Sequence, residues 1–330
     1  MSGQPDSKAF DSRAGEDQDR RSRLRLGLVA EKCPDLLPLL DAANGAVVGG
    51  AFRIEGLMAA GRQFFVWLTT ELETGRTVVL KQARFDYGHP VRYGRADAER
   101  LRRAIRKEYE VLSADRGQTL PQPIALIVDD SPVPAAAVAP ALARNEAFVA
   151  EEFIRGPTLT EMALRVWPDW PSAEREAFAA RLAGAFITFW EALREQGWHY
   201  GDLSSDNFMF EVETGRLRVV DGGSAVAAAE SLVLPGFTPA FTTPNFFATV
   251  SAGRPVAGSL ASVLPLLGKV LHFALSRREP LNGQIPDVDD AALEPYSALC
   301  RLAIELCLSL DSRPERLAEV KLAIARWSGV

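Results

Sequence analysis

The pattern of hydrophobic and polar positions predicts a β-rich stretch followed by a helical one. From Ala51 onward the sequence contains short runs of β-branched and aromatic residues, which predict strands at 64–68, 77–80, 123–128 and 147–154. The first two runs flank Glu73-Thr-Gly75, a hairpin signal, and a helix is expected at about 96–113. Residues 51–154 should therefore form a mostly antiparallel sheet with one helix.

Beyond Gly156 the periodicity becomes helical. One stretch repeats apolar residues every three or four positions, which predicts a helix that Ser172 can cap and that ends at Gly197. Two short strands joined by a turn and then three helices should follow, at 207–212, 217–220, 260–276, 291–308 and 314–327. A small β-rich lobe before a larger helical lobe predicts an α+β fold with a cleft between the lobes.

The N-terminal part of the chain has a different character. Residues 1–24 are polar and charged, which predicts a disordered tail with no secretory signal. A helical pattern from Leu26 to Asp41 predicts an N-terminal extension over 25–50. We therefore expect four segments, at 1–24, 25–50, 51–154 and 155–330.

Composition narrows the classes of partner and compartment. The 330 residues include 47% hydrophobic and 24% charged side chains, and the net charge of −6 gives no support for a nucleic-acid partner. Three cysteines cannot form a disulfide framework, which favours a reducing cytoplasm, and three scattered histidines offer no metal cluster. The longest apolar run, 256–275, contains Pro265, Lys269 and His272, so a buried helix is expected there, with no membrane partner.

A lysine and a glutamate are the first candidate functional pair. Lys81 ends a β-branched run, so its side chain projects from a rigid strand. Its ammonium group is a point charge that suits a phosphate. Glu108 falls within the apolar stripe of the helix at 96–113, where a lone carboxylate is costly unless a cation meets it. Lys81 is the candidate partner; the alternative is that Glu108 sits at the stripe's edge and reaches water.

The segment from Asp202 to Asn207 lies between a helix end and a strand, in a loop held by rigid elements. Asp202 could accept the proton of an acceptor hydroxyl, or orient that hydroxyl, and Asn207 could supply an oxygen ligand to Mg²⁺. The predicted hairpin returns the chain so that Asp221 emerges beside Asn207 and could bridge Mg²⁺ to nucleotide phosphates. A pair of turn aspartates around a hairpin is the structural alternative. Together with Lys81, these groups provide the positioning and charge neutralisation that phosphoryl transfer needs.

These residues, in this order, resemble the protein-kinase-like superfamily from about Phe52 to Arg316. The resemblance implies a two-lobed fold, with a small antiparallel β lobe containing one helix and a larger mainly α-helical lobe. It also implies ATP and Mg²⁺ as cofactors. Lys81 and Glu108 match the strand lysine and helix glutamate, Asp202 and Asn207 the catalytic-loop pair, and Asp221 the aspartate of the Asp-Phe-Gly motif.

Further segments match less completely. Residues 148–156 resemble the hinge whose backbone meets adenine, which implicates Glu151 and Phe153 in nucleotide binding. Gly56 and Gly61 are the glycines kept in the region of the phosphate-covering loop. Residues 312–314 resemble the arginine-containing motif near the domain's end.

Within the superfamily, 79–84 and 97–103 are similar to the kinase domain of class III lanthionine synthetases. That similarity implies a serine/threonine kinase acting on a peptide or protein substrate, with separate lyase and cyclase proteins as partners. Departures from the pattern leave two alternatives. Tyr200 and Gly201 replace the His-Arg pair that usually precedes the catalytic aspartate, which argues against control by activation-loop phosphorylation. Ser204 stands where protein Ser/Thr kinases usually carry a lysine, and the missing lysine fits a small-molecule kinase of the aminoglycoside-phosphotransferase type. The eroded glycine loop fits a nucleotide-binding pseudokinase that acts as a binding module.

Overall fold

A computed structural model describes residues 43–60, 64–83, 95–115, 119–128, 147–166, 170–211, 214–227, 238–252, 260–278, 280–309 and 314–328. The chain divides into two compact units between Ile154 and Arg155. The predicted tail at 1–24 and the predicted helix at 26–41 lie outside the described residues. So do Gly61 and the arginine of the motif at 312–314.

Unit 1 contains a curled antiparallel sheet of six strands in the order β1-β2-β3-β4-β6-β5. The strands are β1 (Val47–Val48), β2 (Phe52–Ala60), β3 (Phe64–Glu71), β4 (Thr77–Ala83), β5 (Pro123–Val128) and β6 (Ala147–Glu152). Helix α3 (Arg95–Asp115) packs against β4, β5 and β6. Among the described residues of 51–154 the predicted antiparallel sheet with one helix is confirmed, and the described part of the chain is of the α+β class.

The predicted turn between β3 and β4 is also confirmed. Gly75 adopts a φ of 71°, the left-handed region that glycine enters without steric cost, and its N–H donates to the Glu71 carbonyl at 2.8 Å. The strands then pair in register from Thr70 opposite Thr77 to Phe64 opposite Ala83. This register fixes which side chains of β4 face each side of the sheet.

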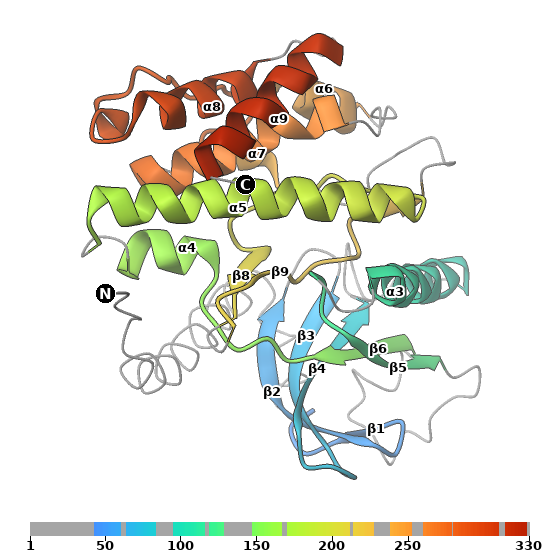
Figure 1. The fold of residues 1–330 in the computed structure, drawn as a ribbon. Coiled ribbons are helices and arrows are strands. Elements are labelled where there is room, and N and C mark those ends of the chain that lie inside the picture. The colour runs from blue at the N-terminus through green and yellow to red at the C-terminus, as the bar shows by residue number, and fades with distance from the viewer. Residues whose placement is uncertain are drawn as a thin grey trace. The chain divides into compact units, whose positions relative to one another are not determined.

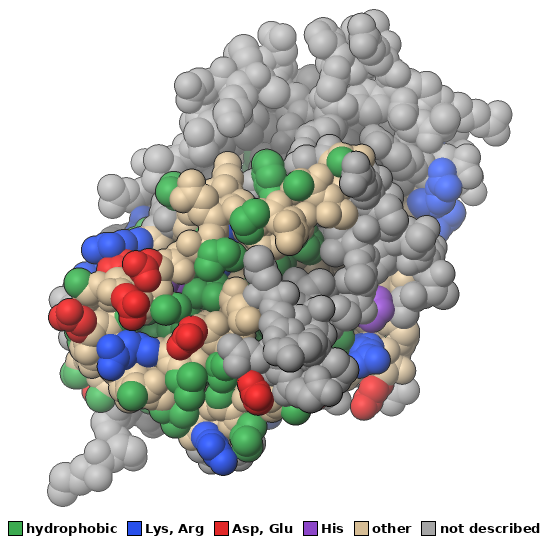
Figure 2. Space-filling model, turned by 90° about the horizontal axis from the view of Figure 1, so that it is seen from above, with side chains coloured by type: hydrophobic (Ala, Val, Ile, Leu, Met, Phe, Trp, Pro, Cys, Tyr) green, Lys and Arg blue, Asp and Glu red, His purple; other side chains and the backbone are tan. Residues whose placement is uncertain are grey.

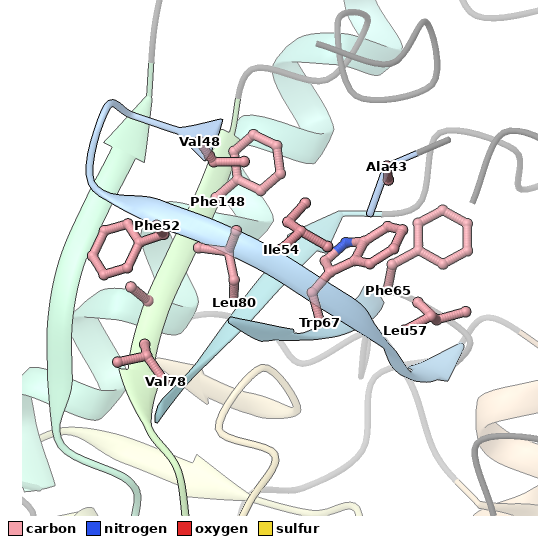
Figure 3. Packing of buried hydrophobic residues seen from close by; sticks show 11 residues of the cluster. Ala43, Val48, Phe52, Ile54, Leu57, Phe65, Trp67, Val78, Leu80 and Phe148 are labelled. Atoms are coloured by element: carbon pink, nitrogen blue, oxygen red, sulfur yellow. The ribbon is translucent and has the colours of Figure 1, made fainter. Parts of the chain in front are cut away.

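The hydrophobic core of unit 1 lies on one face of this sheet. Alternate residues of each strand point to the same face, and a buried cluster forms from Phe52 and Ile54 of β2, Trp67 of β3, Leu80 of β4 and Phe148 of β6, among others (Figure 3). The residues between them, including Lys81 of β4, face the opposite side. Since α3 packs on β4, β5 and β6, that side is covered as well.

Unit 2 is mainly helical. Its helices are α4 (Leu159–Glu161), the π-helical turn η2 (Met162–Val166), α5 (Ser172–Glu195), the 3₁₀ turn η4 (Pro239–Phe241), α6 (Pro244–Ser251), α7 (Leu260–Ser276), the 3₁₀ turn η5 (Ala291–Leu293), α8 (Ala298–Leu308) and α9 (Pro314–Ser328). The long helix α5 packs against α7 and α9, and α8 packs against both of these (Figure 1). Two small antiparallel sheets complete the unit: β7 (Trp198–Tyr200) with β10 (Ala225–Ala227), and β8 (Phe208–Phe210) with β9 (Leu217–Val219).

Two details of the helix predictions are wrong. Ser172 does not cap α5: the cap position is Pro171, no side chain caps the helix, and Ser172 is its first residue. The helix predicted at 291–308 is broken, since only the 3₁₀ turn η5 precedes α8. Pro295 lies in the gap and lacks the N–H that a continuous helix needs, and Ser297 starts the new helix by accepting the N–H of Cys300.

Helix α7 is the segment with the longest predicted apolar run. It spans 17 residues with Pro265 inside, and it buries both Lys269 and His272. Within the part of the chain that the structure describes, no helix combines the length and hydrophobicity needed to cross a bilayer. The run is explained by packing, because α7 contacts α5, α8 and η5.

The surface of the described residues mixes side-chain types. On the described part of the face shown in Figure 2, hydrophobic side chains lie in small groups among Lys, Arg, Asp and Glu. Exposed leucines include Leu302 of α8 and Leu322 of α9. Isolated apolar residues of this kind are normal on a protein surface and do not define a binding face.

Candidate functional site

The first group of candidate residues lies in unit 1, around Lys81. Its Nζ atom is 2.6 Å from Oε1 of Glu108, and the two side chains are 5% and 0% exposed. Strand β4 turns Lys81 to the side covered by α3, and the apolar stripe of α3 turns Glu108 to the sheet. The predicted contact is confirmed, and the alternative of a Glu108 that reaches water is excluded.

A second carboxylate meets the same lysine. Oε1 of Glu151 lies 3.1 Å from Lys81 Nζ, and the Glu151 side chain is 3% exposed. The sequence placed Glu151 at a hinge where its backbone would meet adenine. In the structure Glu151 lies inside β6, where its backbone pairs with Val79 of β4 on one side and Pro123 of β5 on the other. The contact between Glu151 and Lys81 was not predicted.

The remaining candidates of unit 1 are less constrained. Phe153 is the first residue after β6 and is half-buried. Gly56 lies within β2 at an irregularity of the β2–β3 register, and a Cβ atom there would meet nothing within 4 Å. Neither residue contacts Lys81 in a described interaction. Their part in nucleotide binding stays a prediction.

The second group lies in unit 2, in the loop between β7 and β8. Asp202 is the second residue after the end of β7 and is 8% exposed. Its Oδ1 accepts from the backbone N–H and the hydroxyl of Thr238 at 2.8 and 2.9 Å, and its Oδ2 accepts from the Ser224 hydroxyl at 3.3 Å. Asp202 is therefore held in one orientation by donors on two later segments of the chain.

Burial changes the acidity of this group. Removal from water and, to a smaller extent, the negative charge of Asp221 raise the pKa of Asp202 to about 6, against the hydrogen bonds from Thr238 and Ser224, which lower it. A carboxylate with a pKa near 6 is ionised at neutral pH and is a stronger base than an exposed aspartate. Asp202 thus has the protonation behaviour that proton abstraction from a hydroxyl requires.

Asn207 is oriented by its own amide nitrogen. Nδ2 donates to the carbonyl oxygen of Asp202 at 3.0 Å and to the Tyr200 hydroxyl at 3.3 Å. Both hydrogens of the amide are then engaged, so Oδ1 is the atom that remains to bind a cation. The backbone of Asn207 is tied as well, because its carbonyl accepts the N–H of Val220 at 2.9 Å.

The hairpin of β8 and β9 brings Asp221 to the same place. Phe208 pairs with Val219, so the residues before β8 and after β9 leave the hairpin together. Asp221 is half-buried, and its Oδ1 accepts the N–H of Gly223 at 3.1 Å. Oδ2 accepts no hydrogen bond from the described residues, so Asp221 and Asn207 each have one oxygen available to a metal ion.

The donor atoms of Asn207 and Asp221 are of the kind that bind Mg²⁺. Carboxylate and amide oxygens are the ligands that Mg²⁺ takes, usually one or two from the protein, with waters and substrate phosphates completing the shell. Asn207 and Asp221 fit that pattern. Among the described residues no group of three or more His, Cys, Asp or Glu side chains could hold a metal ion, so a dedicated all-protein metal cage is not found there.

Four residues around this group have contacts that the sequence did not predict. Thr238 and Ser224 bond Asp202 from 36 and 22 positions away, and no spacing rule links such distant polar residues. Tyr200 was noted only as a replacement of the usual histidine, yet its ring is fully buried against Phe189 and its hydroxyl meets Asn207. Ser205 accepts the Thr160 hydroxyl at 2.7 Å and joins the loop to α4.

Comparison of the chain with protein-family models and with curated proteins finds no match.

Proposed function

We propose that the protein is an ATP- and Mg²⁺-dependent phosphotransferase with a two-lobed kinase-like fold, acting on Ser or Thr hydroxyls of a peptide or protein. The buried pair of Lys81 and Glu108 is the observation that supports it most directly. A buried charge pair usually contributes little to stability, so stability alone does not explain why Lys81 and Glu108 are buried in unit 1. A lysine that Glu108 holds in position to bind a phosphate group would explain it.

The residues have distinct roles in this proposal. Asp202 accepts the proton of the acceptor hydroxyl as the hydroxyl oxygen bonds to the γ-phosphorus and the bond to the leaving ADP oxygen breaks. Lys81 binds a phosphate oxygen of the nucleotide, and Glu108 holds Lys81 in place. Asn207 and Asp221 would hold Mg²⁺, which supplies neutralisation of phosphate charge when bound.

The acceptor is proposed from the resemblance to class III lanthionine synthetases. A precursor peptide phosphorylated on Ser or Thr would then pass to separate lyase and cyclase proteins. A small alcohol is the alternative acceptor. Ser204 stands where protein kinases usually carry a lysine, and its uncharged side chain offers the acceptor no cation. The residue is buried, and its carbonyl accepts the N–H of Asn207.

A second candidate function is a nucleotide-binding module without transfer. The contact between Glu151 and Lys81 favours it, because a lysine that contacts two carboxylates is less available to hold the terminal phosphates in the position that transfer needs. In that case the protein would act through a partner that senses the bound nucleotide.

Calorimetric titration with ATP tests the proposal before any acceptor is known. The wild-type protein should bind ATP more tightly with Mg²⁺ than without it. Asp221→Ala should lose that difference while keeping its fold, because one of the two proposed metal ligands is gone. Absence of ATP binding by the wild-type protein in both conditions would refute the proposal, and a Mg²⁺ effect that survives in Asp221→Ala would refute the metal assignment.

A further inference from the structure

Lys81 is shared between two carboxylates, and Glu151 is the one without a role in the proposed function. Val79 pairs with Glu151 and Lys81 with Val149 across the antiparallel strands β4 and β6. Lys81 and Glu151 are therefore diagonal neighbours on one face of the sheet, within reach of long side chains. The 3.1 Å contact is a consequence of strand register, and the two backbones that produce it lie in the middle of the sheet.

The two carboxylates approach the lysine from different elements. Glu108 reaches Lys81 from helix α3, at 2.6 Å, and Glu151 reaches it from the strand next to β4. All three side chains are at most 5% exposed. In such a setting charges interact more strongly than in water, so adding or removing one anion has a large effect.

We propose that Glu151 competes with nucleotide phosphate for Lys81 and thereby weakens nucleotide binding; this inference rests on the proposed function. A phosphate oxygen that binds Nζ must share it with, or displace, the carboxylates already present. Glu108 makes the shorter contact, and Glu151 makes the longer one, so Glu151 is the anion that gives way. Glu151 thus sets the affinity for nucleotide, and with it the rate at which nucleotide leaves.

Matched isosteric variants separate the two carboxylates. Glu151→Gln removes one negative charge and keeps the size and shape of the side chain, and Glu108→Gln does the same on the other side of Lys81. Glu151→Met, of similar length and apolar, is a second variant should the glutamine be poorly accommodated. Circular dichroism and thermal melting of each variant establish that the protein is folded.

The measurement is the Kd for ATP with Mg²⁺, and for inorganic triphosphate, which lacks the base. Glu151→Gln and Glu151→Met should bind both ligands about tenfold more tightly than the wild type, because an anion beside Lys81 has been removed. Glu108→Gln should bind both more weakly, because Lys81 is no longer held by the helix.

The outcomes distinguish the two proposals. If the wild type binds ATP and the folded Glu151 variants bind it equally or more weakly, the competition is refuted while the proposed function stands. A gain for ATP without a gain for triphosphate would also refute it, since the effect would then act through the base. If the wild type and all variants fail to bind either ligand, the proposed function is refuted, and the competition with it.

Discussion

Lys81 of strand β4 and Glu108 of helix α3 form a buried ion pair with 2.6 Å between Nζ and Oε1, across 27 positions of sequence. Breaking a buried pair by removing one partner leaves an uncompensated charge. Lys81→Met should therefore lower the free energy of unfolding by about 3–5 kcal/mol, measured by urea denaturation at pH 8.

The matched control is an exposed pair of the same unit. Arg53 and Glu55 are 2.9 Å apart with side chains 48% and 38% exposed. Glu55→Gln should change the free energy of unfolding by less than about 1 kcal/mol, because water solvates both groups. A Lys81→Met protein as stable as Glu55→Gln would contradict the burial of the carboxylates that Lys81 contacts.

The ionised Asp202 carboxylate, which the proposed function requires, should lower the stability of the folded protein. Its pKa is about 6 in the folded protein, against 3.8 for an ordinary aspartate such as that of the unfolded chain, so the folded state favours the protonated form. The cost of the ionised form is absent below pH 3.8, grows between pH 3.8 and 6, and is complete above pH 6. Asp202→Asn removes that charge and should raise the free energy of unfolding at pH 8 by about 1–3 kcal/mol.

The comparison of wild type and Asp202→Asn is best made by urea denaturation at several pH values. The difference in stability should shrink as the pH falls from 6 toward 4. A variant less stable than the wild type at pH 8 would mean that the hydrogen bonds from Thr238 and Ser224 outweigh the burial of the charge.

Thr238 should tune the base through its hydroxyl. Its hydrogen bonds favour the ionised form of Asp202, so Thr238→Val should raise the Asp202 pKa and move the acidic limb of the kcat/KM profile to higher pH by about one unit. In Ser224→Ala the acidic limb of the kcat/KM profile should also move to higher pH, but by a smaller amount, because the hydrogen bond from Ser224 is longer, at 3.3 Å. An unchanged limb in Thr238→Val would show that another group sets the profile.

Gly156 is required by the segment that enters unit 2. A Cβ atom there would lie 1.7 Å from the carbonyl oxygen of Phe210, and this segment is bonded to β8 because Phe210 donates its N–H to Pro157 O at 3.0 Å. Gly156→Ala should reduce the free energy of unfolding by about 2 kcal/mol or more.

Gly184, inside α5, is the control for that substitution. Its Cβ would meet Ser328 Oγ at 3.5 Å, an ordinary contact, so Gly184→Ala should raise stability by about 0.5–1 kcal/mol through helix propensity. Thermal denaturation of both variants checks the pair. Equal effects would contradict the close approach of Gly156 to β8.

The strands, helices and turns of both units could mostly be predicted, because periods of 2 and 3.6 residues and turn glycines such as Gly75 are local signals. The contact between Lys81 and Glu108 could be predicted because a lone carboxylate stands out in an apolar helical stripe. Glu151 offered no such contrast. The first five residues of β6 are all buried, so alternation does not reveal which side chains face the lysine.

Contacts between distant segments were beyond sequence reasoning. The approach of Thr238 to Asp202 depends on how the chain returns over 36 positions, and no local pattern encodes that return. The break before α8 depended on Pro295, a local signal that the apolar periodicity of the flanking residues obscured.

The central claim is phosphoryl transfer. The measurement is the transfer of labelled γ-phosphate from ATP with Mg²⁺ to Ser/Thr-rich peptides and to amino alcohols, by wild type and Asp202→Asn in parallel. We expect label on a peptide with the wild type and none with Asp202→Asn, which keeps its fold and its ATP binding. Equal transfer by Asp202→Asn would contradict the role of Asp202, and no transfer by the wild type to any acceptor would contradict the claim and favour the binding module.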